Sequence, residues 1–246
     1  MYLNEENWLK KKNKKILIIL VLMVLCAFFI LNSQVSYYQG INYRVRIVKI
    51  PLYLKVIDFF SRHYNYKITA EEIIAGSKSD KEKAVRLLKW TQENIRPVPP
   101  GLPLIDDHVW HIIIRGYGTD DQFQDVFTTL CNYAELDGFF CWINSADNKQ
   151  KKPFSFVRLK RGWTFFDAYR GVYFKNSKQE IANINDLLAN NWHIVSISNR
   201  DIFEDYGAYF KSLRYLNYEN CKLSRAAIQS PFKRFLFWNK NKKYGL

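Results

Sequence analysis

The segment between residues 116 and 141 constrains the fold more than any other part of the chain. A turn bracketed by Gly116 and Gly118 leads into Thr119 and Asp120, which are both favourable residues at a helix N-cap. Apolar residues then recur at helical spacing: Val126, Phe127, Leu130, Tyr133 and Ala134. An Asp-Gly pair ends this pattern after Leu136, and the apolar run 139–143 follows. The segment therefore predicts a loop, a buried helix over residues 120–136 and a buried strand.

The predicted helix begins directly after a glycine-rich loop. Enzymes place nucleophiles or bind anions at such a position, because free backbone N–H groups and the helix dipole favour negative charge there. The same dipole predicts that Asp120 and Asp121, in the first turn, stay ionised. An ordinary core helix with an acidic first turn explains the pattern equally well, so the pattern by itself leaves both interpretations open.

Residues 85–174 resemble the core of the transglutaminase-like domains, which are relatives of papain-type thiol enzymes. In that family a Cys begins the buried helix, a later strand begins with the catalytic His, and a catalytic Asp follows a hairpin and a Trp. Here residues 154–159 stand where the His strand belongs, residues 160–163 form the hairpin with its Trp, and Asp167 is the family Asp. The resemblance implies an α+β fold in which a buried helix packs on an antiparallel sheet, preceded by one N-terminal transmembrane helix.

This chain departs from the family pattern at two of the three catalytic positions. The family Cys falls at Asp120, and the family His falls at Phe154 or Ser155. A carboxylate is a poor nucleophile toward amides, and without an imidazole there is no general base to activate a nucleophile. The resemblance thus implies the fold of a degenerate member without implying its thiol chemistry.

Two functions of different classes fit these residues. In the first, the chain is a binding or accessory domain that holds a peptide, a glycan or an envelope protein in the family cleft, around Asp120, Asp121, Gln122 and Asp167. Similarity to a subgroup found in bacterial envelope and surface-polysaccharide settings favours that role. A structural subunit of a polysaccharide assembly machine is a variant of the same idea.

In the alternative, the chain is a hydrolase or transferase with a rewired carboxylate and histidine site. Carboxylates cluster at positions 106, 107, 120, 121 and 167, and paired carboxylates can perform glycoside chemistry. His108 or His111 would then act as the acid or base. On a strand through Ile112–Ile114 these two histidines face opposite sides, which makes them a poor pair of ligands for one metal ion. We therefore expect no metal and no cofactor.

The N-terminus has the pattern of a membrane anchor. Five lysines between residues 10 and 15 precede sixteen uncharged apolar residues, Ile16–Leu31, and aromatic residues flank both ends. A transmembrane anchor over residues 16–36 is the favoured interpretation, and a cleaved signal peptide is the competitor. By the positive-inside bias, a single-pass protein of the inner or plasma membrane has a cytoplasmic N-terminus and its domain outside.

The remaining boundaries follow from composition and charge. Residues 1–15 form a basic cytoplasmic start, 37–68 a juxtamembrane helical segment, 69–238 the domain with its C-terminal helices, and 239–246 a basic tail. The net charge of +14 is spread through the chain and suits anionic lipid or glycan partners, whereas no nucleic-acid motif accompanies it. The four cysteines are expected to be structural thiols, with a pairing of Cys131 and Cys141 left open.

Overall fold

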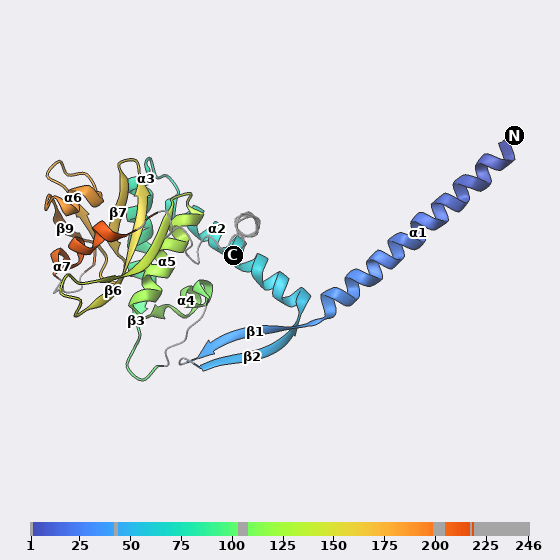
Figure 1. The fold of residues 1–246 in the computed structure, drawn as a ribbon, viewed down its shortest axis with the longest axis horizontal. Helices are drawn as coiled ribbons and strands as arrows, with labels where there is room; N and C mark the ends of the chain where they lie inside the picture. Colours follow the sequence, from blue (N-terminus) through green and yellow to red (C-terminus); the bar gives the residue numbers. More distant parts are fainter. Residues whose placement is uncertain (1, 42–43, 103–107, 199–204, 217, 219–246) are drawn as a thin grey trace. The chain divides into compact units, whose positions relative to one another are not determined.

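The structure is a computed structural model that describes residues 2–41, 44–102, 108–198, 205–216 and 218 (Figure 1). The predictions for Asp106, Asp107, Cys221, the helical stretch 224–238 and the tail 239–246 lie outside these residues. The chain divides into two compact units, residues 1–39 with 45–59 and residues 40–44 with 60–246, and each is described by itself.

The first unit contains the helix that was predicted as the anchor. Helix α1 spans Tyr2–Asn32, and its stretch Lys12–Asn32 has a mean hydropathy of 2.8 with none of it buried. It is long and apolar enough to cross a membrane. Strands β1 (Gln34–Ile41) and β2 (Arg44–Pro51) follow and pair with each other, and helix α2 (Leu52–Ile74) begins directly after them. The Leu52 N–H donates to the Ser33 carbonyl at 2.9 Å, which joins the start of α2 to the end of α1.

The prediction of a helical segment over residues 37–68 is wrong in its first part. Residues 37–41 and 44–51 belong to the two strands, and the last residues of the predicted anchor, 34–36, already lie in β1. The reason is local: residues 44–50 alternate basic and apolar types and are rich in β-branched side chains, which favours a strand. The capping-box pattern at Thr69 also begins no new helix, since α2 continues through it to Ile74.

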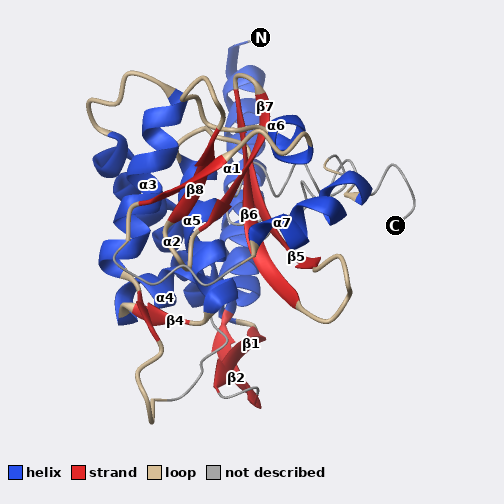
Figure 2. Cartoon of the chain, turned by 90° about the vertical axis from the view of Figure 1, so that its left-hand side faces the viewer, coloured by secondary structure: helices blue, strands red, loops and turns tan. Residues whose placement is uncertain are grey.

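The second unit is built on a five-stranded antiparallel sheet in the order β5-β6-β7-β8-β9. Its strands are β5 (Gly138–Asn144), β6 (Lys151–Leu159), β7 (Gly162–Asp167), β8 (Val172–Lys175) and β9 (His193–Ser196). Helices α3 (Asp80–Asn94) and α5 (Asp120–Tyr133) pack on one face, and α6 (Ile184–Leu188) and α7 (Tyr206–Phe210) pack on the other (Figure 2). The predicted α+β class is confirmed: a buried helix packs on an antiparallel sheet, and one apolar helix precedes this domain in the chain.

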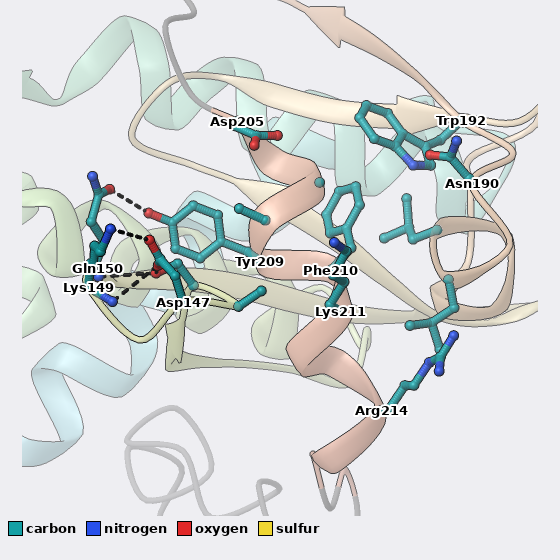
Figure 3. Close-up of a pocket in the computed structure, with 16 residues that line it drawn as sticks. Asp147, Lys149, Gln150, Asn190, Trp192, Asp205, Tyr209, Phe210, Lys211 and Arg214 are labelled. Atoms are coloured by element: carbon teal, nitrogen blue, oxygen red, sulfur yellow. Dashed lines mark hydrogen bonds and ion pairs between the residues drawn. The ribbon is translucent and has the colours of Figure 1, made fainter.

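The domain has two hydrophobic cores, one on each face of the sheet, and side chains that alternate along the strands contribute to both. Val157 and Phe166 face the α3 and α5 side, whereas Phe156 and Phe165 face α7 and the 3₁₀ helix η1 (Lys211–Tyr215). Figure 3 shows Tyr209 and Phe210 on α7, in the second of these layers. Because successive strand residues point to opposite faces, each strand serves both layers of helices.

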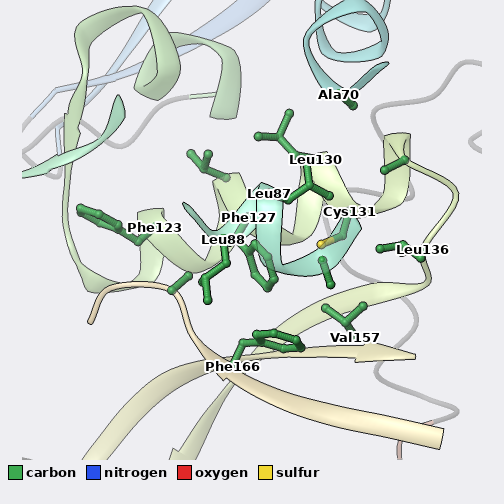
Figure 4. Packing of buried hydrophobic residues seen from close by; sticks show 14 of the residues in the cluster. Ala70, Leu87, Leu88, Phe123, Phe127, Leu130, Cys131, Leu136, Val157 and Phe166 are labelled. Carbon is green, nitrogen blue, oxygen red and sulfur yellow. The ribbon is translucent and has the colours of Figure 1, made fainter. Parts of the chain in front are cut away.

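Helix α5 is the most buried element of the first core. Phe123, Val126, Phe127 and Leu130 are fully buried, and Phe127 packs against Phe166 of β7 with ring centroids 5.2 Å apart (Figure 4). Cys131 is buried as a free thiol, and burial raises its pKa well above the ordinary value. Cys141 is also free, so no disulfide joins the two.

The predicted strand at Ile112–Ile114 is instead part of helix α4 (Val109–Arg115). A run of three isoleucines suits a short buried strand or a helix, and the flanking residues decide between them. His108 stands at the N-cap, and Gly116 ends the helix in the left-handed conformation with φ of 70°. Val109 and Ile112, three apart, are buried, whereas Ile114 is 67% exposed. Beyond α4, the short strands β3 (Arg96–Pro97) and β4 (Tyr117–Gly118) pair in parallel.

Candidate functional site

The start of helix α5 is built from three of the residues predicted from the sequence. Thr119 is the N-cap, and its N–H donates to Gln122 Oε1 at 3.1 Å. Arg115 Nη2 donates to the same oxygen at 2.8 Å. The Thr119 hydroxyl donates to Asp121 Oδ1 at 2.5 Å. The side chains of Asp121 and Gln122, which were candidates for ligand binding, therefore form hydrogen bonds that cap the N-terminus of α5.

Gln124 is the centre of the site, and the sequence interpretation missed it. Its side chain is fully buried one turn after Asp120. Its Oε1 accepts from the Ser155 hydroxyl at 2.7 Å and from the Ala168 N–H at 3.0 Å. Its Nε2 donates to Asp167 Oδ1 at 3.3 Å and to Asp120 Oδ1 at 3.4 Å. One amide thus links helix α5, strand β6 and the end of strand β7.

Asp167 lies at the end of β7 and is fully buried. Its Oδ1 accepts from the Tyr169 and Arg170 N–H groups, both at 3.1 Å, in addition to Gln124. Its Oδ2 accepts from Arg170 Nη1 at 3.1 Å and from the Tyr206 hydroxyl at 2.8 Å. A carboxylate is costly to bury unless it is paired and hydrogen-bonded. These donors meet that requirement completely.

The loop after Asp167 is held in place by helix α3. Gln92 Nε2 donates to the Ala168 carbonyl and, at 3.3 Å, to the Tyr169 carbonyl. Gly171 has φ of 68°, and a Cβ there would come within 2.8 Å of side-chain atoms of both Gln92 and Ser198. Glycine is therefore required at this turn, which presents the two backbone N–H groups to Asp167.

Asp120 is mostly buried beside Asp167, and its pKa is raised to about 7. Burial is the main cause and the charge of Asp167 is the second, while the hydrogen bond from Gln124 and the charges of Arg170 and Lys152 act in the opposite direction. The pKa of Asp120 is therefore shifted in the direction opposite to the one that the helix dipole predicts. Desolvation and a neighbouring carboxylate outweigh the effect of the helix N-terminus, which is worth about 0.3–1 kcal/mol at an exposed site.

Phe154 and Ser155, the two residues predicted for the family His position, point to opposite faces of the sheet. Ser155 faces Gln124 and is fully buried, whereas Phe154 points to the other face of the sheet, against Phe165 at 4.7 Å and Tyr209 at 5.1 Å between ring centroids. Phe154 therefore belongs to the second core and leaves the site to Ser155. A hydroxyl without an adjacent base cannot replace the imidazole of a thiol enzyme.

The two candidate histidines lie on α4 and its N-cap, with ring centroids 5.8 Å apart. Within the described part of the chain, neither is a hydrogen-bond partner of Asp120 or Asp167, whose partners are Gln124, Arg170, Tyr206 and backbone N–H groups. The structure thus brings Asp120 and Asp167 together around Gln124, and no hydrogen bond between described residues joins either carboxylate to the two histidines. Among all residues that the structure describes, no group of three or more His, Cys, Asp or Glu side chains is placed to hold a metal ion.

Three side chains of the network are fully buried, whereas Asp120 is partly exposed. Gln124, Ser155 and Asp167 are all fully buried, and the two cavities described for this unit are lined by residues 142–151, 187–192 and 205–216. Cys131 lies near the other end of α5 and Cys141 on β5, so neither thiol stands at the helix start. Gln124 could have been suspected from the sequence, because it follows Asp120 by four residues and interrupts an apolar helix face.

No protein-family model matches the sequence, and no curated protein matches it significantly. Parts of three solved structures are similar in fold. A candidate protease from Parabacteroides distasonis is 10% identical over 55% of this chain and 35% of its own, with a TM-score of 0.37. A candidate cysteine protease from Cytophaga hutchinsonii is 12% identical over 63% and 61%, with a TM-score of 0.39. A protein named a TGase is 7% identical over 55% and 43%, with a TM-score of 0.34.

This chain spans 35% to 61% of the length of the three proteins. TM-scores below 0.4 describe a distant likeness, which carries nothing about activity or substrate. The fold described above therefore rests on the chain's own helices and strands.

The raised pKa of Asp120 predicts a pH-dependent stability. Between its ordinary value of 3.8 and about 7, the folded protein binds more protons at this site than the unfolded chain does. The free energy of unfolding contributed by this group therefore falls as the pH rises from about 4 to about 7, and stays low above that range. Asp120→Asn should match the wild type near pH 4 and exceed it by on the order of 2 kcal/mol at pH 8, discounted for partial exposure.

The measurement is urea unfolding of both proteins from pH 4 to pH 8. Asp137→Asn, at an exposed turn, is the matched control for loss of a carboxylate without burial. Equal stability of Asp120→Asn and the wild type at pH 8 would show that Asp120 is ionised without cost.

Proposed function

We propose that this chain is a membrane-anchored transglutaminase-like domain that acts by binding, as an accessory component of the cell envelope or of surface-polysaccharide assembly, without thiol catalysis. One observation carries the proposal: the positions of the thiol enzyme's Cys and His hold Asp120 and Ser155, and Gln124 joins them in a buried network with Asp167. That network satisfies its own polar groups, so the family position supports the fold rather than a reaction. The binding site must then lie elsewhere on the domain.

The membrane part of the proposal concerns orientation. Helix α1 supports an anchor by its length and hydropathy, and the five lysines before the apolar run favour a cytoplasmic N-terminus. In this topology the domain lies outside the cytoplasm. An alkaline phosphatase fused after Leu246 should then be active in intact bacterial cells, since that reporter folds only after export. Activity of a β-galactosidase fusion at the same point, with an inactive phosphatase fusion, would reverse the orientation.

The absence of thiol catalysis is tested with the purified full chain in detergent. We expect no turnover on a panel of transglutaminase, amidase and peptidase substrates, before or after treatment with iodoacetamide. The physical reason is that Cys131 is fully buried with a raised pKa, and a buried thiol yields little of the reactive thiolate. Turnover that iodoacetamide abolishes, and that Cys131→Ser or Cys141→Ser also abolishes, would overturn the proposal.

The second candidate is acid catalysis by the carboxylate pair. It is favoured by one observation, the pKa of about 7 at Asp120, which would leave this group protonated and able to donate a proton below neutral pH. Against it stands Asp167, whose oxygens are already occupied by five donors. Turnover that resists iodoacetamide, falls as the pH rises through 7 and disappears in Asp120→Asn would favour this candidate.

A further inference from the structure

The largest described cavity lies on the opposite side of the sheet from the Gln124 network. It has a volume of about 830 Å³, within the roughly 300–1,000 Å³ of small-molecule sites. Its walls come from three places in the chain: the loop between β5 and β6, the turn between α6 and β9, and α7 with η1 (Figure 3). The functions argued above use none of these residues.

The walls of this cavity are held in place by the fold. The Ala146 N–H donates to the Ala208 carbonyl at 2.8 Å, which joins the β5–β6 loop to α7. The Tyr209 hydroxyl donates to Gln150 Oε1 at 2.9 Å across the same junction (Figure 3). On the other wall, Asn190 adopts a left-handed conformation with φ of 56°, and its N–H donates to the Leu187 carbonyl at 3.1 Å. The cavity is thus preformed, which lowers the entropic cost of binding.

An aromatic ring with an unused donor lines one side. Trp192 packs against Phe174 and Phe210, with ring centroids 5.5 and 5.0 Å apart. Its indole Nε1 is buried and has no hydrogen-bond partner among the residues that the structure describes. Buried donors in native proteins are nearly always satisfied, so a partner supplied by a ligand explains this one.

Two unpaired cations line the opposite side. Lys211 and Arg214 are exposed on η1 and form no ion pair within the described ranges, whereas Lys149 is 3.7 Å from its own partner, Asp147. Asp205 also lines the cavity and offers an acceptor. The lining therefore combines an aromatic ring, a free N–H donor, side-chain amides and a carboxylate with a surplus of one positive charge.

From this combination we propose that the cavity binds an acidic saccharide. Hydroxyl groups both donate and accept, which matches the mixed set formed by Asp205, Asn190, Gln150 and the Trp192 N–H. Lys211 and Arg214 provide charge-assisted hydrogen bonds to a sugar carboxylate or sulfate. The carboxylate of Asp205 needs a hydrogen-bond donor from the ligand, and a sugar hydroxyl can supply one. The proposal rests on the proposed binding function and gives it a site and a ligand class.

The test is isothermal titration calorimetry on the full chain in detergent with defined probes. Tetragalacturonate and a hyaluronan tetrasaccharide should bind, more weakly as the salt concentration rises, and neutral galactotetraose should bind at least tenfold more weakly. Arg214→Gln and Lys211→Gln should each lower the affinity about tenfold, and Trp192→Phe, which keeps a ring and loses the donor, about threefold. Arg158→Gln is the matched control, because Arg158 is exposed on β6 away from the cavity.

Three outcomes would overturn the inference. The first is that neither acidic saccharide binds. The second is that both saccharides bind Arg214→Gln as tightly as they bind Arg158→Gln. The third is that tetraglutamate binds as tightly as the saccharides and that its binding depends on Arg214. Failure of this inference is distinct from failure of the proposed function. Absent binding together with absent turnover removes only the cavity assignment, whereas turnover that iodoacetamide abolishes removes the binding function and leaves the titration result standing.

Discussion

The buried carboxylate of Asp167 requires several hydrogen-bond donors, and separate parts of the domain supply them. A fully buried charge needs several donors, and here they come from Gln124 on α5, the turn at Tyr169 and Arg170, and Tyr206 on α7. Helices from both faces of the sheet are thereby tied to the end of one strand. Burial and, second, the charge of Asp167 raise the pKa of Asp120, and both oppose the effect of the helix dipole at the first turn of α5.

This arrangement separates fold from chemistry. In a thiol enzyme of this architecture, a Cys, a His and an Asp must face one another at the helix start. In this chain Asp167 accepts hydrogen bonds from the Tyr169 and Arg170 N–H groups, from Arg170 Nη1 and from the Tyr206 hydroxyl. Gln124 and Ser155 are fully buried and joined by a hydrogen bond of 2.7 Å. The cavity lined by Trp192, Lys211 and Arg214 lies on the other face of the sheet, and the buried indole N–H of Trp192 has no hydrogen-bond partner among the described residues.

Local signals predicted much of this fold and little of the network. The helix and strand within residues 116–144 follow from glycine placement and apolar spacing, whereas Asp167 was singled out by the resemblance to the transglutaminase-like domains. The paired strands β1 and β2 were not predicted, because the basic and aromatic composition of this segment was given more weight than the alternation of residues 44–50. Gln124 was missed because a polar residue on a helix usually marks the solvated face. The cavity lining could not be predicted, since it joins residues 145–150, 187–192 and 205–214, which only the tertiary fold brings together.

The central claim is that the hydrogen bonds of Gln124 and Asp167 stabilise the fold of this domain. Its most direct test is the urea unfolding free energy of Gln124→Met, in which the side chain keeps its length and loses its hydrogen bonds. The Ser155 hydroxyl, the Ala168 N–H and one oxygen of Asp167 would then each lose a buried partner. We predict a loss of about 3 kcal/mol or more, with the matched exposed variant Gln179→Met unchanged. A Gln124→Met protein as stable as the wild type would contradict the account.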